Sequence, residues 1–292
     1  MDINDSVEVD QEAALGTSRV FFLPAALCAV ACMLQLVPLL IARGLDGNFS
    51  AKTFFWVQAV AQILQQLVIF KFAMCGATGG FMCFGSASDI HCKVSLYLAG
   101  VFTYLPDWLA VPLSVDRLVA IQFPITYKQK ATQRSAWVAI IPLVVITLAL
   151  FMPKSLEAHV GRKNDCDSDL GSFDTFLSLS GVGAIASVII FTSALLAVIA
   201  MKKNQKRGDS RKQREATTAL VTISVVSGLF GSIHYALLMI GFFRRDSGPP
   251  EQMLMLLGLA QLVNSVGIII RSPVLLIMQT MRGAFLRGVG FN

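Results

Sequence analysis

Residues 93–120 have the sequence KVSLYLAGVFTYLPDWLAVPLSVDRLVA, and this apolar run predicts the fold. At 1.5 Å per residue, a helix of this length extends over about 42 Å, more than the ~30 Å thickness of a bilayer's hydrocarbon core. The run has charged residues near its two ends and one, Asp107, in its interior. We therefore predict a transmembrane helix that ends in the charged pair Asp116-Arg117.

Six further apolar runs reach the length of about 20 residues that a spanning helix needs. They lie at residues 20–42, 53–75, 136–153, 174–201, 217–243 and 252–279. The loops between them are short and polar, and the runs are continuous rather than alternating, which excludes a transmembrane β-barrel. The sequence therefore predicts an all-α membrane protein, a seven-transmembrane helix bundle (residues 20–280) between an extracellular tail (1–19) and a cytoplasmic eighth helix and tail (281–292).

The composition of the whole chain leads to the same class. The 292 residues are 55% hydrophobic and 14% charged, with a mean hydropathy of +0.66. A soluble domain carries about 25% charged residues, and a disordered chain has far fewer apolar ones. Both classes are therefore excluded.

Most of the 24 Lys and Arg residues lie on one side of the predicted bundle, above all in the loop at residues 202–214. Because basic loops stay on the cytoplasmic side, we expect the N-terminus outside the plasma membrane and the C-terminus inside. The same loops would lie close to the anionic lipid headgroups of the bilayer. That placement accounts for the net charge of +6 without a nucleic-acid partner.

The residues after the third run carry a family signature. Residues 114–127 have the sequence SVDRLVAIQFPITY. The pair Asp116-Arg117, followed by Pro124 and Tyr127, resembles the Asp-Arg-Tyr motif and second inner loop of rhodopsin-like (class A) G-protein-coupled receptors. We expect a divergent member, such as an invertebrate peptide or chemosensory receptor, because Leu118 replaces the Tyr of that motif.

The resemblance implies a receptor rather than an enzyme, without cofactor or metal, that binds an extracellular ligand and activates a heterotrimeric G protein. The residues that would couple to the G protein or take part in activation are Asp116, Arg117, Pro124, Tyr127 and Pro273. Pro273 belongs here because Ser272-Pro273 resembles the family's Asn-Pro motif in the seventh helix. Residues 281–285 resemble its short amphipathic eighth helix.

A disulfide is also implied. Cys92 lies 25 positions before Arg117, as the family's outer-loop cysteine does, and Cys166 matches its partner in the loop before the fifth helix. The pairing of the other outer cysteines stays open. Asn4 begins an N-x-Ser sequon on the outer tail, where it could carry a glycan.

In this family, ligands bind between the outer halves of the third, sixth and seventh helices. The matching positions are Ala99, Gly100, Thr103, Phe230, Ile233, His234, Leu262 and Val266. Amine receptors have an Asp where Ala99 stands, and opsins have a Lys where Val266 stands. The resemblance therefore argues against a biogenic amine and against retinal, and we expect a peptide or a small chemosensory ligand.

Three polar residues lie within predicted membrane helices: Gln62, Asp107 and Arg271. A charged side chain in hydrocarbon needs a partner, and Asp107 and Arg271 are expected at similar depths. Gln62 replaces the family's sodium-binding Asp. We hypothesise that Asp107 and Gln62 hold the Arg271 guanidinium; alternatively, each charge bonds backbone carbonyls freed by nearby prolines.

The same three residues also suit an alternative function, a membrane transporter or channel. A transporter should show paired repeats with broken helices at matching positions, and the sequence has none. A membrane hydrolase would need a second acid or a metal cluster facing Asp107. The three histidines are too scattered along the chain to form such a cluster.

Overall fold

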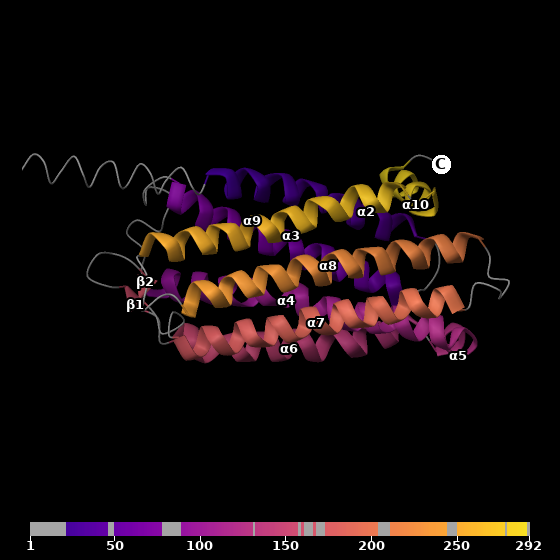
Figure 1. Ribbon diagram of the computed structural model, residues 1–292, viewed down its shortest axis with the longest axis horizontal. Coiled ribbons are helices and arrows are strands. Elements are labelled where there is room, and N and C mark those ends of the chain that lie inside the picture. The colour runs from indigo at the N-terminus through magenta and orange to yellow at the C-terminus, as the bar shows by residue number, and fades with distance from the viewer. Residues whose placement is uncertain are drawn as a thin grey trace, which may run out of the picture.

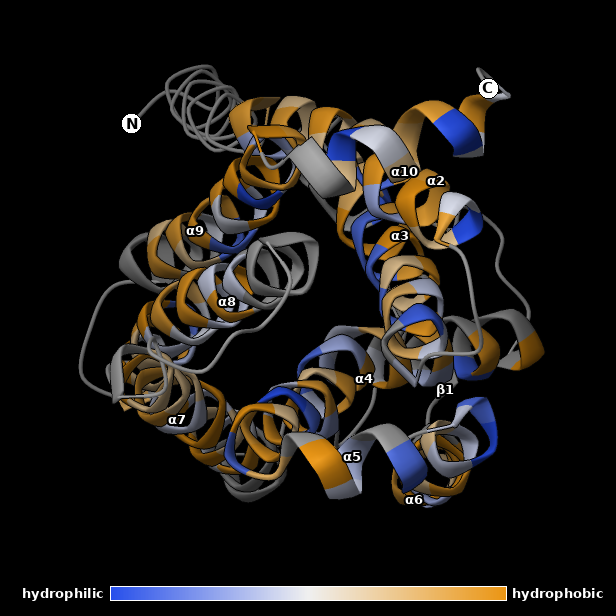
Figure 2. Ribbon diagram, turned by 90° about the vertical axis from the view of Figure 1, so that its right-hand side faces the viewer, coloured by the Kyte–Doolittle hydropathy of each residue, from blue (hydrophilic) through white to orange (hydrophobic). Residues whose placement is uncertain are grey.

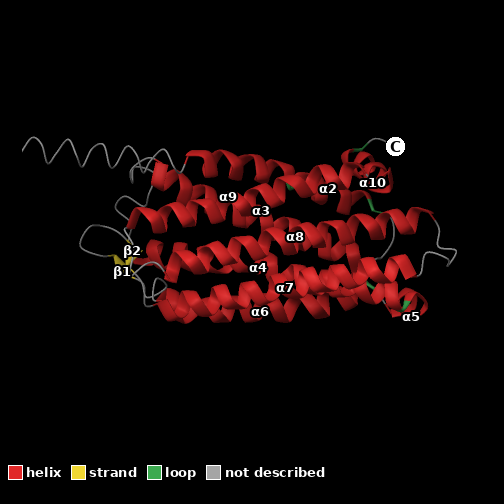
Figure 3. Ribbon diagram, viewed as in Figure 1, coloured by secondary structure: helices red, strands yellow, loops and turns green. Residues whose placement is uncertain are grey.

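The computed structural model describes residues 22–45, 50–77, 89–130, 132–156, 159–160, 166–167, 173–203, 211–243, 250–277 and 279–290. Long helices run side by side along one axis and make up nearly all of this described part (Figure 1). A short hairpin, β1 (His159–Val160) and β2 (Cys166–Asp167), pairs antiparallel with Val160 opposite Cys166. Figure 3 shows the helices in red and this hairpin in yellow at one end of the bundle.

The helices coincide with the predicted apolar runs. Residues 22–34 are helical and continue into α2 after a turn at residue 35. The elements that follow are α2 (Leu36–Gly44), α3 (Ser50–Ala77), α4 (Asp89–Gln122), α5 (Pro124–Lys130), α6 (Gln133–Leu156), α7 (Phe173–Lys203), α8 (Arg211–Phe243), α9 (Pro250–Ile277) and α10 (Gln279–Val289). Six described helices, counting residues 22–44 as one, are long and apolar enough to cross a membrane, and the 34-residue α4 is the seventh of the bundle.

The outer surface of the bundle is apolar. Exposed side chains on α6 include Val138, Ile141 and Val145, and those on α7 include Ile185 and Val188. Figure 2 shows hydrophobic residues (orange) over the outward faces of the helices, with hydrophilic positions of α3 and α9 turned inward. In lipid such a surface is well solvated, because the hydrocarbon tails are as apolar as these side chains.

Helix α4 lies in the interior of the bundle, and aromatic rings pack around its middle. Tyr104 stacks on Phe151 of α6, with ring centroids 5.6 Å apart, and on Tyr235 of α8 at 6.2 Å. Two glycines make room for these rings. A Cβ atom added at Gly100 would lie 2.4 Å from the Phe151 ring, and one at Gly183 of α7 would lie 2.3 Å from the Tyr235 ring.

Helix α10 is the predicted eighth helix, and it begins at Gln279 rather than at residue 281. It packs against α2 at backbone distance. A Cβ added at Gly44 would lie 1.7 Å from the Ala284 carbonyl oxygen, and one at Gly288 would lie 2.0 Å from the Leu40 carbonyl oxygen. Arg287 Nε donates to the Gly44 carbonyl at 3.1 Å, which satisfies a free carbonyl at the end of α2. Helices α5 and α10 lie at the end of the bundle opposite the β hairpin (Figure 1).

Candidate functional site

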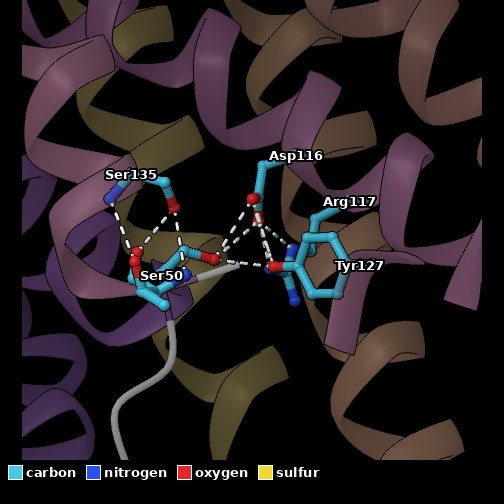
Figure 4. A network of polar contacts seen from close by, with 6 residues as sticks. Ser50, Asp116, Arg117, Tyr127 and Ser135 are labelled. Atoms are coloured by element: carbon cyan, nitrogen blue, oxygen red, sulfur yellow. Dashed lines mark hydrogen bonds and ion pairs between the residues drawn. The ribbon is translucent and has the colours of Figure 1, made fainter. Parts of the chain in front are cut away.

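Four side chains meet at the end of the bundle where α5 lies. Asp116 and Arg117 come from the last turns of α4, Ser50 begins α3, and Tyr127 comes from α5 (Figure 4). Arg117 Nε donates to Asp116 Oδ2 at 3.0 Å, and an Nη2 of the same guanidinium contacts both Asp116 and the Tyr127 hydroxyl. The Arg117 guanidinium also lies 5.5 Å from the centre of the Tyr127 ring. We call Ser50, Asp116, Arg117 and Tyr127 the inner network.

Asp116 is the acceptor at the centre of the inner network. The Tyr127 hydroxyl donates to Asp116 Oδ2 at 2.9 Å, and the Ser50 hydroxyl donates to Oδ1 at 3.1 Å. The Ser50 and Tyr127 hydroxyls also lie 2.6 Å apart. Burial raises the pKa of the Tyr127 phenol above its ordinary value, and the Arg117 charge cancels only part of this rise. The phenol therefore stays protonated near neutral pH and keeps its donor.

Local sequence explains how α5 brings Tyr127 to this place. Pro124 is the first residue of α5, where the missing N–H of proline costs nothing and its fixed φ favours a helical start. One turn later, Tyr127 points back to the end of α4.

The next helix, α6, is capped reciprocally: Thr132 N donates to Ser135 Oγ at 3.0 Å, and Ser135 N donates to Thr132 Oγ1 at 3.3 Å.

The expected ligand-binding residues of α8 do not all face the interior. His234 is buried and its Nδ1 lies 2.8 Å from the Ala260 carbonyl oxygen of α9. Ile233 is 42% exposed and lies on an outward stripe with Leu229 and Ile240. Ile233 therefore does not belong to the buried group that His234 joins.

The remaining expected pocket residues lie on α4, α8 and α9. Gly100 provides the space for Phe151, as described above, and the Thr103 carbonyl accepts from Gln65 Nε2 of α3 at 2.8 Å. Phe230 packs on α9, since a Cβ at Gly267 would lie 2.7 Å from its Cβ. Leu262 and Val266 of α9 are half-buried. Ala99 lies in α4, but its side chain is outside the described part.

The hypothesis of an Asp107–Arg271 ion pair is wrong. The Tyr235 hydroxyl of α8 donates to Asp107 Oδ2 at 2.6 Å, so the half-buried acid finds a neutral donor instead of the guanidinium. Positions along a helix predicted the depth of Asp107 but not the direction in which it points around the α4 axis. The hydrogen bond links α4 to α8 inside the membrane.

Gln62 lies near Arg271, but no hydrogen bond joins the two side chains among the described contacts. Both line a cavity of about 20 Å³ between the first helix, α3, α8 and α9, along with Gln35, Gln58 and Ser272. Arg271 is buried, and its Nε has no hydrogen-bond partner among the described residues. Next to it, Pro273 lies inside α9 and its side chain is exposed.

Two predicted features fall outside the described side chains. Cys166 is placed by its backbone in β2, and the hairpin lies against α4, the helix that contains Cys92. The side chains of both cysteines are outside the described part, so the Cys92–Cys166 disulfide stays a prediction. Asn4 and its tail also lie outside the described residues.

Sequence reasoning missed Ser50, Tyr235 and Ser272 as interaction partners. The Ser272 hydroxyl donates to the Leu34 carbonyl at 2.9 Å. That carbonyl has lost its helical donor because Pro38, four residues on, has no N–H. A proline is a visible signal that a carbonyl is free, but nothing in the sequence tells which helix supplies the donor.

Comparison with known proteins agrees with this architecture. The family model described as 7 transmembrane receptor (rhodopsin family) matches residues 35–266, which is most of the chain. No match is found among curated proteins. The match covers α3 to α8 and most of α9, and thus the inner network, Asp107 and His234. The chain therefore belongs to the rhodopsin family of seven-transmembrane receptors, multi-pass proteins of the plasma membrane that are receptors and not enzymes.

Proposed function

We propose that this receptor activates a heterotrimeric G protein through Arg117, with its N-terminus outside the cell and its C-terminus in the cytoplasm. The inner network is the observation that carries the proposal. It holds the one guanidinium of the family's Asp-Arg motif at the end of α4, beside α5 and at the same end of the bundle as α10.

In the arrangement described, Arg117 is in a closed state. Its guanidinium bonds to Asp116 of its own helix and to Tyr127 of α5, and the residue is only 8% exposed. Release of Arg117 would break these hydrogen bonds and the ion pair with Asp116. Water can then hydrate the separated side chains, because they lie at a helix end. A pair of this kind suits a two-state switch, because both arrangements satisfy the same charges.

The proposed ligand is a peptide or a small chemosensory molecule that binds at the opposite end of the bundle. Ala99 and Val266 stand where an amine receptor and an opsin need charged residues, so the ligand needs neither a cationic amine nor a Schiff base. Tyr104, His234 and Tyr235 pack together inside the bundle, with the His234 and Tyr235 rings 5.0 Å apart. Aromatic side chains of this kind favour contact with apolar or aromatic groups of a ligand.

The test uses cells that express the receptor with energy-transfer sensors for each G-protein class, exposed to a peptide and odorant library. We expect at least one ligand to cause G-protein dissociation, and Arg117→Ala to abolish the signal without loss of surface expression. Arg134→Ala is the matched control, because Arg134 is an exposed cation at the same end of the bundle, in the first turn of α6. Equal signals from Arg117→Ala and the unmodified receptor would contradict the proposal.

A further inference from the structure

The cavity around Arg271 has room for one water molecule or one small ion. It has a volume of about 20 Å³, and one water molecule needs roughly 10–15 Å³ by the same measure. Its polar lining consists of Gln35, Gln58, Gln62, Arg271 and Ser272. None of the residues that line it is acidic. The cavity therefore carries the positive charge of Arg271 and no compensating carboxylate.

The guanidinium of Arg271 lacks a direct counter-ion. Arg271 is 7% exposed, and its Nε has no hydrogen-bond partner among the described side chains and backbone groups. Within the described part of the chain, the one ion pair joins Arg117 to Asp116. Asp107 attracts the guanidinium through space but bonds to Tyr235. A buried cation in this position gains much from an anion in contact with it.

The other polar groups of the cavity are amides. Gln58 and Gln62 lie one turn apart on α3, are both buried, and each carries an NH₂ group. Gln35 is 1% exposed and its Oε1 has no partner among the described groups. A turn of the Gln35 amide by 180° exchanges its oxygen and nitrogen and presents a third NH₂ donor. Amide groups from two helices, the first helix and α3, thus line a space next to the positive charge of Arg271 on α9.

We infer that this cavity binds one small monovalent anion, chloride or a halide of similar size. The donors and the charge select an anion over a cation, and a space of about 20 Å³ suits a monatomic ion. The anion joins the first helix, α3 and α9 through Gln35, Gln62 and Arg271, and Ile223 of α8 lines the same cavity. The site is separate from the inner network and does not depend on the proposed G-protein coupling.

The test measures thermal unfolding of the purified full-length receptor in detergent at constant ionic strength. Replacing gluconate by chloride, or by bromide, should raise the melting temperature saturably, by about 2–4 °C when the anion exceeds its Kd tenfold. Exchange of sodium for choline at constant chloride should leave it unchanged. Equal melting temperatures in gluconate and chloride would mean that the cavity holds only water, and a rise with sodium would mean a cation site; either result overturns the inference.

Two variants and one control locate the effect. Arg271→Gln should remove the dependence on chloride. Gln62→Glu should remove it as well, because the new carboxylate neutralises the guanidinium from within, and this variant decides the matter if Arg271→Gln does not fold. Arg282→Gln, which removes an exposed cation of α10, should keep the full chloride effect. A chloride effect that survives Gln62→Glu would contradict the assignment of the site to this cavity.

Discussion

The sequence predicts how deep a residue lies in the membrane, but not the direction in which its side chain points around the helix axis. The sequence predicts that Asp107 lies in the membrane and needs a partner, and both expectations are consistent with its bond to Tyr235. It does not predict that partner, because the rotation of α4 and α8 about their axes depends on packing. Glycines at positions 100 and 183 allow the rings of Phe151 and Tyr235 to approach, and that approach sets the rotation.

The Asp107–Tyr235 hydrogen bond should contribute measurably to stability. Tyr235→Phe leaves the half-buried carboxylate of Asp107 without its donor, and we expect a loss of about 1–3 kcal/mol in the free energy of unfolding. Asp107→Asn should cost less in the Tyr235→Phe background than in the unmodified receptor, since the two groups interact. Thermal melts of the four proteins test the coupling. Strictly additive losses would show that the two groups are independent.

Ser272 gives a second prediction at this scale. Ser272→Ala leaves the Leu34 carbonyl without a donor in the first helix, at an expected cost of about 1–3 kcal/mol. Ser232→Ala is the matched control: the Ser232 hydroxyl donates to the Gly228 carbonyl of its own helix at 2.7 Å, and that carbonyl already accepts a backbone N–H. The comparison of the two melting temperatures is the measurement. A loss for Ser272→Ala no larger than for Ser232→Ala would contradict our interpretation of the Pro38 position.

At the scale of elements, the sequence predicts which segments are helices better than where they end. The sixth apolar run begins at residue 217, but α8 begins at Arg211. Hydropathy detects the part of a helix that lies in lipid, and polar turns that continue into water leave no such signal. The eighth helix is predictable from its resemblance to a family motif, whereas its contact with α2 through Gly44 and Gly288 is not.

That contact predicts unequal effects of two glycine substitutions in α10. Gly288→Ala places a methyl group against the Leu40 carbonyl, 2.0 Å away, and should separate α10 from α2 and lower the melting temperature. Gly283→Ala has only Arg287 Nη1 within 4 Å, at 3.7 Å, and alanine favours a helix by about 1 kcal/mol, so this control should be neutral or stabilising. Equal stability of the two variants would contradict the packing described here.

The predicted Cys92–Cys166 disulfide would join α4 to the β hairpin. Loss of a native disulfide costs about 2–5 kcal/mol in small secreted domains, so Cys92→Ser and Cys166→Ser should each reduce surface expression, and the double variant should be no worse than either. Cys32→Ser, which changes a free cysteine of the first helix, is the control. Peptide mapping that pairs Cys92 with any cysteine other than Cys166 would refute the prediction.

For the whole molecule, composition and seven apolar runs are sufficient to predict the bundle. A spanning helix forms all its backbone hydrogen bonds within itself, and it must be apolar over a known length. The inner network was predictable in part, since Asp116, Arg117 and Tyr127 belong to one motif. Ser50 was not, because it lies on another helix and has no pattern of its own. The Arg271 cavity likewise depends on residues from four helices, which only the fold brings together.

The most direct test of the account is guanine-nucleotide exchange by purified heterotrimers, with the receptor in nanodiscs and the peptide and odorant library added in pools. We predict that at least one pool accelerates exchange on at least one G protein through the unmodified receptor and the Arg134→Ala control, but not through Arg117→Ala. Exchange that no pool accelerates with any G protein, or that Arg117→Ala accelerates equally, would contradict the central claim that Arg117 of the inner network activates a G protein.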